Sequence, residues 1–238
     1  MTRHLVAMGG GGFSMSQFGE PTALDAFLIG LTGSEHPRVC FAPTASGDDA
    51  GYIHRFLTAY GALGVRTSVL TLWTGASEAV DRLAEADLLF VGGGSTVNLV
   101  ALWQAHGVID VVRQRSADGD LVLAGISAGA ACWYEGCVTD SFGDLRPWTG
   151  GFGLVRGSFC PHLDGEPGRD PVYAAAVASG ELPGGYAADD GAGVHYVDGS
   201  PARFICERPG RGVYRVLPNN VPGPPVIREP QEMTLLPG

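Results

Sequence analysis

Short apolar runs alternate with longer amphipathic stretches through the first half of the chain. The apolar runs predict strands at residues 5–8, 39–42, 68–73, 88–91 and 121–124, and the stretches between them predict helices at 23–31, 52–60, 79–83 and 97–111. Strands that alternate with helices are joined by right-handed crossovers in a mostly parallel sheet. Because the strands are continuously apolar, helices are expected to cover both faces of that sheet.

The alternation of apolar runs with amphipathic stretches is less regular after about residue 150. Further strands are predicted at 194–197, 203–206 and 213–216, and the Pro-rich tail from about residue 217 predicts edge or irregular structure. No internal repeat and no low-complexity linker divides the 238 residues. We therefore predict one α/β domain spanning residues 1–238.

Composition narrows the class of protein. Acidic residues exceed basic ones by ten, which argues against binding to nucleic acid or to an anionic membrane. The five cysteines are odd in number and irregularly spaced, as expected for reduced thiols in the cytoplasm rather than for disulfides or a zinc site. The apolar run near the N-terminus is too short for a signal peptide, and no run approaches the length of a membrane helix. A cytoplasmic protein is expected.

The strongest chemical motif follows the predicted strand at 121–124. The sequence Gly125-Ile-Ser127-Ala-Gly129 matches the G-x-S-x-G pattern of a nucleophile elbow, in which a strained turn exposes a serine hydroxyl. Glycines two positions to either side remove side chains that would collide with neighbouring backbone. The N–H of Ala128 is then placed to donate to an oxyanion. A plain tight turn with an incidental serine is the competing interpretation.

A nucleophilic serine needs a base, and an acid to orient that base. Among the six histidines, His162 differs because it follows an apolar strand end and a proline, and the other five are interpreted as structural or solvated. The sequence alone does not separate the candidate acids, which are Asp140, Asp144, Asp164, Asp189 and Asp190.

Two further glycine clusters follow predicted strands. The cluster 92–94 precedes Ser95 and Thr96, either of which can cap the next helix. Gly93 or Gly94 is predicted to supply a second oxyanion donor, although a flexible turn with a cap also fits. The cluster 9–12 lacks the last glycine of a dinucleotide fingerprint, so close backbone packing near the active site is favoured there.

The order of the candidate residues bears on the fold. An α/β-hydrolase runs serine, acid, histidine, with the histidine near the C-terminus. Here a long segment follows His162, and the best-placed acids, Asp189 and Asp190 at another predicted strand end, come after it. We therefore predict a flavodoxin-like α/β fold similar to class I glutamine amidotransferases. An amidotransferase activity would require cysteine where Ser127 stands.

Six motifs together resemble the peptidase E family of serine peptidases, the aspartyl dipeptidases, to which cyanophycinase is related. The matching stretches are 8–14 (MGGGGFS), 41–46 (FAPTAS), 90–96 (FVGGGST), 125–130 (GISAGA), 160–164 (CPHLD) and 187–191 (AADDG). The resemblance implies that Ser127 is the nucleophile, His162 the base and Asp190 the triad acid, where the family often has glutamate. It further implies oxyanion donors at Gly93 and Ala128 and an additional acid at Asp140.

The chain departs from the family at two points. Ser95 stands where the family usually has asparagine, and the stretch between His162 and Asp190 is shorter. Arg169 is the counterpart of the arginine that binds the substrate's aspartyl carboxylate, or else a solvated surface arginine.

The resulting prediction is a serine dipeptidase-like enzyme without metal or cofactor, acting on short peptides as a monomer or homodimer. The alternatives are a cyanophycinase-like or other amide or ester hydrolase, and a non-catalytic small-molecule binding module.

Overall fold

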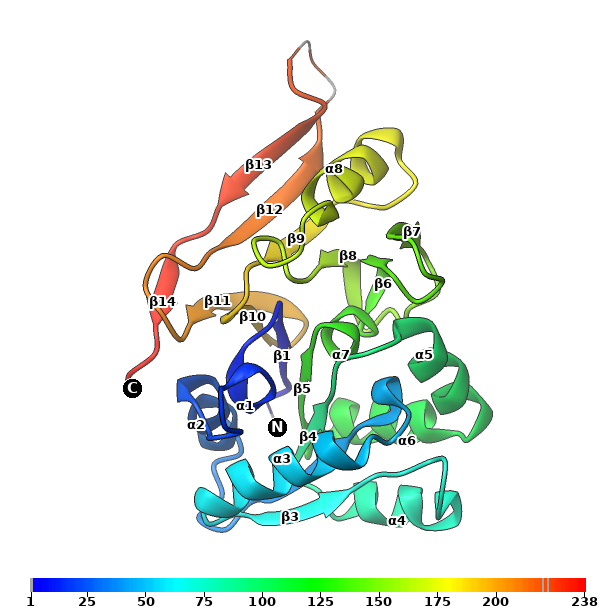
Figure 1. Ribbon diagram of the computed structural model, residues 1–238, viewed down its shortest axis with the longest axis vertical. Helices are drawn as coiled ribbons and strands as arrows, with labels where there is room; N and C mark the ends of the chain where they lie inside the picture. Colours follow the sequence, from blue (N-terminus) through cyan, green and yellow to red (C-terminus); the bar gives the residue numbers. More distant parts are fainter. Residues whose placement is uncertain (1, 220, 222) are drawn as a thin grey trace.

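Two mixed sheets and their flanking helices appear in the computed structural model, which describes residues 2–219, 221 and 223–238 (Figure 1). The first sheet comprises β1 (His4–Met8), β2 (Arg38–Ala42), β3 (Arg66–Val69), β4 (Leu88–Val91), β5 (Val122–Ile126), β10 (Ala192–Val197), β11 (Ser200–Cys206) and β14 (Met233–Leu235). The second comprises β6 (Tyr134–Thr139), β7 (Arg146–Trp148), β8 (Val155–Cys160), β9 (Gly185–Ala188), β12 (Val213–Pro218) and β13 (Val226–Pro230).

The helices are short to medium in length. They are α1 (Gly12–Met15), α2 (Ala23–Gly30), α3 (Ala50–Ala62), α4 (Ala79–Ala84), α5 (Thr96–Ala105), α6 (Val108–Asp118), α7 (Ala128–Ala131) and α8 (Arg169–Ser179), with 3-10 turns η1 (Thr44–Ser46) and η2 (Ala76–Glu78). No helix in the described ranges combines the length and apolarity needed to span a bilayer.

The first sheet contains the predicted parallel core. Its strand order is β14-β11-β10-β1-β5-β4-β2-β3, and every neighbouring pair from β1 to β3 runs parallel. Successive residues of β1 point to opposite faces, as the strand period requires. Leu5 and Ala7 pack toward α4, α5 and α6, whereas Val6 and Met8 pack toward α1, α2 and α3. The α/β fold with helices on both faces is thus confirmed.

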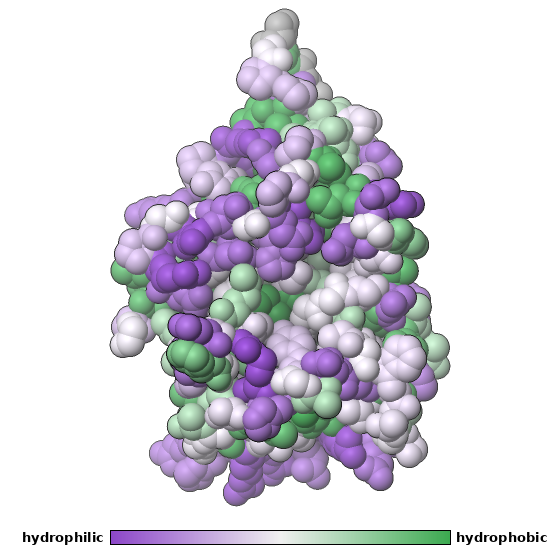
Figure 2. All heavy atoms as spheres, viewed as in Figure 1, coloured by the Kyte–Doolittle hydropathy of each residue, from purple (hydrophilic) through white to green (hydrophobic). Residues whose placement is uncertain are grey.

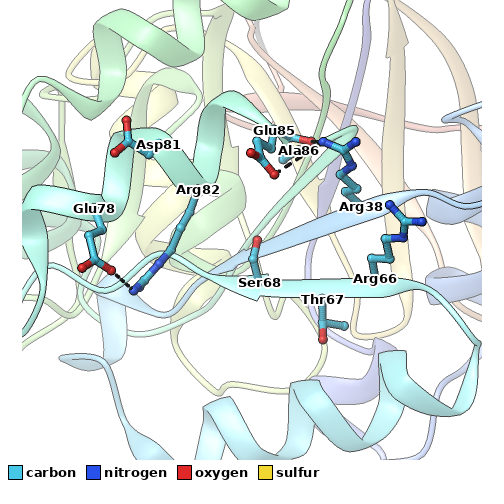
Figure 3. Close-up of a pocket in the computed structure, with 9 residues that line it drawn as sticks. All are labelled: Arg38, Arg66, Thr67, Ser68, Glu78, Asp81, Arg82, Glu85 and Ala86. Carbon is cyan, nitrogen blue, oxygen red and sulfur yellow. Dashed lines mark hydrogen bonds and ion pairs between the residues drawn. The ribbon is translucent and has the colours of Figure 1, made fainter.

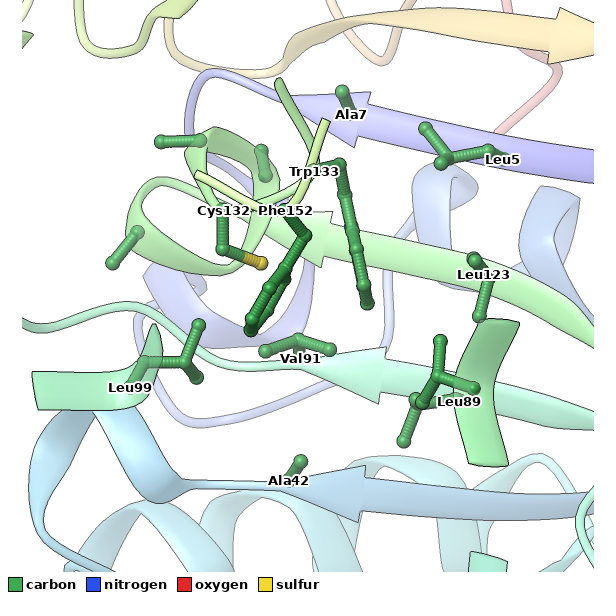
Figure 4. Close-up of a cluster of buried hydrophobic side chains, with 14 of the residues drawn as sticks. Leu5, Ala7, Ala42, Leu89, Val91, Leu99, Leu123, Cys132, Trp133 and Phe152 are labelled. Atoms are coloured by element: carbon green, nitrogen blue, oxygen red, sulfur yellow. The ribbon is translucent and has the colours of Figure 1, made fainter. Parts of the chain in front are cut away.

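Aromatic side chains fill both layers of the core. Trp103 of α5 and Trp133 are fully buried on the first face, where Trp133 and Phe152 lie over β4 and β5 (Figure 4). On the second face, Phe13 of α1 makes edge contacts with Phe41 and Tyr60. Each such ring contributes about 2–3 kcal/mol by leaving water. Outside this core, hydrophilic side chains cover much of the molecular face in Figure 2.

Two predicted elements differ in the structure. The helix expected at 97–111 is divided into α5 and α6, because Gly107 adopts a left-handed φ of 68° between them. The strand expected at 68–73 lies earlier, as β3. The N–H groups of Leu72 and Trp73 donate instead to the Asp48 carboxylate, at 2.7 and 2.9 Å, so this segment turns away from the sheet.

The second half of the chain adds strands in both sheets. The expected strands at 194–197 and 203–206 lie within β10 and β11, which extend the first sheet in antiparallel fashion. The second sheet has the order β13-β12-β9-β8-β6-β7, and of its strands only the one expected at 213–216 was predicted, within β12. Beyond residue 217, β13 forms its edge beside β12, and β14 returns to the edge of the first sheet (Figure 1).

Three neighbouring strands bring the glycine clusters together. β1, β5 and β4 lie side by side and run parallel, so their carboxyl ends meet at one edge of the sheet. Residues 9–12 follow β1, Ser127 follows β5 and residues 92–94 follow β4. This edge is where open parallel sheets collect ligands.

Candidate active site

Ser127 occupies a strained turn between β5 and α7. Its φ of 53° and ψ of −115° are rare for a residue with a side chain, and such strain costs about 1–3 kcal/mol. The Ser127 N–H donates to the Met8 carbonyl at 3.0 Å, which ties the turn to the end of β1. The geometry is that of a nucleophile elbow, in which the turn holds the serine side chain clear of the sheet.

The flanking glycines make this turn possible. A Cβ at Gly125 would overlap the Gly129 carbonyl within the turn, and a Cβ at Gly129 would overlap the Val91 carbonyl of β4. The second clash is the predicted collision with a neighbouring strand. The clash at Gly125 is different, because the crowding there arises between two residues of the elbow itself.

His162 follows β8 and contacts the carboxylate of Asp190, which follows β9. The distance from His162 Nδ1 to Asp190 Oδ1 is 2.6 Å, and both side chains are only 14% exposed. His162 has a left-handed φ of 53°. This short bond orients the ring and favours the tautomer that carries its proton on Nδ1.

Two glycines border the Asp190 carboxylate, and a second acid holds the Asp190 backbone. A Cβ on Gly10 or on Gly165 would overlap it, so both glycines border it closely. The N–H of Asp190 donates to Asp164 Oδ1 at 2.8 Å, and Asp164 in turn pairs with Arg211. The cluster at 9–12 therefore packs closely at the site, as interpreted from the sequence.

Asp190 is the aspartate that bonds to His162. Asp140 lines the same cavity but makes no contact with the imidazole among the described residues. Asp189 is directed elsewhere, because its Oδ2 accepts the Gly212 N–H at 2.8 Å, and burial raises the pKa of its carboxyl. Asp164 supports the Asp190 backbone, and Asp144 is exposed.

Ser127 and His162 share one cavity of about 260 Å³. Its walls are formed by Ser14, Met15, Tyr52, Gly93, Gly94, Ile126, Ser127, Asp140, His162, Glu166 and Arg169. Within the described part of the chain, no hydrogen bond joins the Ser127 hydroxyl to the ring. Such contacts often tighten only when substrate binds.

The two expected oxyanion donors flank Ser127. Ala128 is the next residue and begins α7, whereas Gly93 approaches from the β4 side. A Cβ on Gly93 would lie 3.4 Å from the Ser127 Cβ, and the Gly93 N–H donates to the Tyr52 hydroxyl at 3.4 Å. The neighbouring Ser95 caps α5 by accepting the Asn98 N–H at 3.3 Å, as the sequence predicted.

Arg169 lies at the cavity but is already paired. Its side chain is 4% exposed, its Nε donates to Glu166 Oε2 at 2.7 Å, and its Nη1 donates to the Val138 carbonyl at 3.2 Å. The other carboxylate oxygen, Glu166 Oε1, lies 4.0 Å from His162 Nε2. The interpretation of Arg169 as a solvated surface residue is therefore wrong.

Sequence reasoning missed three residues at this cavity. Glu166 lies four residues after His162 and three before Arg169. Residues at these spacings contact one another only in a helical turn, and the sequence did not predict a turn at this position. Tyr52 falls in the helix expected at 52–60 and Ser14 in the motif 8–14, and neither was given a chemical role. Their hydroxyl oxygens lie 2.5 Å apart.

None of the other five histidines lines the cavity that contains Ser127. His195 of β10 stacks on His4 of β1, with a ring separation of 5.2 Å, and burial lowers the pKa of His195 to about 4. The described ranges contain no group of three or more His, Cys, Asp or Glu side chains arranged to hold a metal ion.

A second cavity, of about 490 Å³, lies where β2 and β3 begin, at the opposite end of these strands (Figure 3). Its three arginines are matched by three acids. Arg38 pairs with Glu85 at 3.5 Å and Arg82 with Glu78 at 2.7 Å. Most of its charge is thus neutralised internally.

Comparisons with known proteins agree with one another. The model of peptidase family S51 matches residues 5–203. The chain is 43% identical over 216 residues to the uncharacterized peptidase YgaJ of Bacillus subtilis (strain 168), covering 90% of this chain and 92% of that protein.

Two solved structures share the fold. A peptidase from an acI-B1 Actinobacterium superposes with a TM-score of 0.71 at 17% identity, covering 98% of this chain and 95% of that one. A putative peptidase E protein from Listeria monocytogenes EGD-e gives 0.61 at 19% identity, covering 87% and 99%. At these identities the likeness shows the fold alone.

Proposed function

The chain belongs to peptidase family S51, and on that premise we propose that it hydrolyses short peptides through a Ser127–His162–Asp190 triad. The family predicted from the six motifs is thereby confirmed. The observation that carries the proposed triad is the 2.6 Å contact between His162 and Asp190, at a cavity that the elbow serine also lines.

In the proposed mechanism, His162 donates a hydrogen bond from its Nδ1–H to Asp190 and keeps that proton, so the neutral ring has a lone pair on Nε2. Nε2 takes the Ser127 proton as Oγ attacks the scissile carbonyl. The N–H groups of Gly93 and Ala128 stabilise the negative oxygen of the tetrahedral intermediate. The imidazolium then protonates the leaving amine, which departs and leaves an acyl-enzyme.

The second half of the reaction reuses the same groups. A water molecule loses a proton to His162 Nε2 and attacks the acyl carbonyl. Collapse of the second intermediate breaks the ester bond and returns the proton to Ser127. The products are a carboxylic acid and the amine released earlier.

The cavity bears on the substrate. A volume of about 260 Å³ is small beside ordinary ligand pockets, which supports short peptides. Arg169 is the candidate for recognising an N-terminal aspartyl side chain. Because Glu166 already accepts its Nε–H, an acidic side chain would compete with an internal carboxylate. We therefore propose dipeptidase-like activity without a strict aspartyl requirement.

The cysteines support a cytoplasmic location for this activity. All five are unpaired and buried. Burial raises the pKa of Cys40 to about 11 and that of Cys160 to about 12, which keeps these thiols protonated and unreactive. We propose that the protein acts in the reducing cytoplasm.

Fluorophosphonate labelling followed by intact-mass measurement tests the proposal. Wild type is expected to gain one adduct, which Ser127→Ala and His162→Ala both lose. A dipeptide library, simple esters and an aspartyl-arginine polymer are then compared as substrates. Turnover of esters alone would overturn the peptidase assignment, and absence of any adduct or turnover would favour a binding module.

A further inference from the structure

Two hydroxyl groups that the triad does not use meet at the cavity wall. Tyr52 projects from α3 and Ser14 from α1, and their oxygens lie 2.5 Å apart. Both residues line the cavity that contains Ser127. Tyr52 also accepts the N–H of Gly93, one of the proposed oxyanion donors.

The Tyr52–Ser14 pair has one hydroxyl hydrogen that the bond between the two residues does not use. Each hydroxyl carries one hydrogen, and the bond between them uses one of the two. The Gly93 N–H occupies a lone pair of Tyr52, not its hydrogen. Among the hydrogen bonds of the described residues, neither hydroxyl donates to any other protein acceptor. The remaining hydrogen is available to a molecule in the cavity.

The Tyr52 ring is held in place and stays neutral. It packs against Phe41 at 4.9 Å in an edge contact and against Phe13 at 5.7 Å. A Cβ on Gly92 would approach Tyr52 Cε1 to 2.8 Å, so the first glycine of the cluster 92–94 leaves room for the ring. Burial also raises the pKa of the phenol, so that it keeps its proton.

The contact with Gly93 indicates that the unused hydrogen lies next to the expected oxyanion position. At 3.4 Å, this hydrogen bond is longer than the usual 2.7–3.2 Å, so the N–H remains free to bind a more strongly charged acceptor. An oxyanion bound to Gly93 would lie beside the Tyr52 hydroxyl. Building on the proposed function, we propose that Tyr52 is a further catalytic residue that donates a hydrogen bond to the oxyanion.

In this arrangement Ser14 is a positioning residue. Its O–H donates to the Tyr52 oxygen, which directs the phenolic hydrogen into the cavity. Hydrogen bonds in such a chain polarise one another, so Tyr52 becomes a stronger donor while Ser14 holds it. The segment after β1 thereby has two roles: Gly10 packs against Asp190, and α1 contributes to catalysis through Ser14.

Kinetics of Tyr52→Phe test the proposal, since the ring and its packing remain. Loss of an oxyanion donor is expected to lower kcat about 100-fold with KM little changed. A peptide aldehyde, whose adduct with serine carries an oxyanion, should bind correspondingly more weakly, whereas a dipeptide product should bind as before. Ser14→Ala should lower kcat about fivefold. Tyr173→Phe is the matched control, because it removes a buried hydroxyl that pairs with Ser158 at 2.8 Å away from the cavity.

The outcomes separate this proposal from the one on which it rests. If wild type turns over peptides and Tyr52→Phe keeps both its kcat and its aldehyde affinity, the role of Tyr52 is overturned while the triad stands. If wild type neither labels at Ser127 nor hydrolyses peptides, both proposals fall. Thermal unfolding of each variant identifies a folding defect. If Tyr52→Phe is defective, the aldehyde affinity of Ser14→Ala tests the role of Tyr52 instead: weaker binding supports it and unchanged binding overturns it.

Discussion

Glu166 accepts the Nε–H of Arg169 at 2.7 Å, so the guanidinium that lines the cavity of Ser127 is neutralised from within the chain. Glu166 is 44% exposed, whereas Arg169 is 4% exposed. The Glu166 carboxylate is therefore the member of the pair that can move away. We expect the preference for charged substrates to depend on Glu166, because its carboxylate competes with a substrate carboxylate for Arg169.

Glu166→Gln is expected to raise kcat/KM for peptides with an acidic N-terminal residue about tenfold relative to an alanyl peptide. The substitution removes the negative charge that competes for Arg169 and repels a second carboxylate. Paired kinetics on two dipeptides measure the ratio. Glu229→Gln is the control, since Glu229 pairs with Arg215 at 3.6 Å on the exposed side of the second sheet. An unchanged ratio would show that Glu166 does not set charge preference.

Asp190→Asn should lower kcat about 10⁴-fold without unfolding the protein, because the amide favours the wrong imidazole tautomer. Asp140→Asn, at the same cavity but without contact to His162, should change kcat far less. Steady-state kinetics on both variants, with circular dichroism to verify folding, make the comparison. Equal losses would mean that Asp140 shares the role of triad acid.

Gly10→Ala is expected to lower kcat about 100-fold, because the added methyl group displaces the Asp190 carboxylate and with it His162. Gly61→Ala serves as the reference. Gly61 lies within α3 with open space around it, and alanine there should stabilise the protein by about 0.5–1 kcal/mol. Activity and the free energy of unfolding are measured for both. Full activity in Gly10→Ala would contradict the close packing around Asp190.

The pH dependence of stability should carry a contribution from Asp25. Burial raises the pKa of this carboxyl from 3.8 to about 6, although it accepts hydrogen bonds from Phe13 and Thr22. The folded state therefore binds the proton more tightly than the unfolded state. Its stabilising contribution is full below pH 3.8 and is lost as pH rises to about 6.

The difference in unfolding free energy between wild type and Asp25→Asn isolates this contribution, because other carboxylates cancel. Wild type should lose stability relative to the variant between about pH 4 and pH 6, by an amount on the order of 3 kcal/mol. Urea titrations at several pH values measure it. A difference that stays flat with pH would show that Asp25 titrates normally.

The parallel core could be predicted from sequence because its strands are buried on both faces. After His4 and Arg38 at their first positions, β1 and β2 are apolar runs, as are β4 and β5, and a glycine or proline lies within or directly after each strand. The elbow at Ser127 was also readable, since Gly125 and Gly129 are required by local crowding.

Most of the second sheet could not be predicted, because its strands lack a continuous apolar pattern. β6 contains a glycine and a glutamate, β7 has three residues, and β9 consists of small residues and one tyrosine. These strands are defined by their pairing, not by a periodic pattern. The contact of His162 with Asp190 likewise joins residues 28 positions apart, and only the family resemblance singled out Asp190. Side-chain pairs such as Glu166 with Arg169 depend on rotamers, which the sequence does not specify.

The position of β1 between β5 and β10 has a consequence for biosynthesis. During synthesis β1 has no strand partner until residues 122–126 emerge, and its other edge stays open until residues 192–197 follow. Pairings so distant in sequence form slowly. The Asp190 carboxylate also reaches His162 only late in translation. The nascent chain should therefore remain inactive, with the apolar strand β1 exposed on one edge, until residues 192–197 have been made.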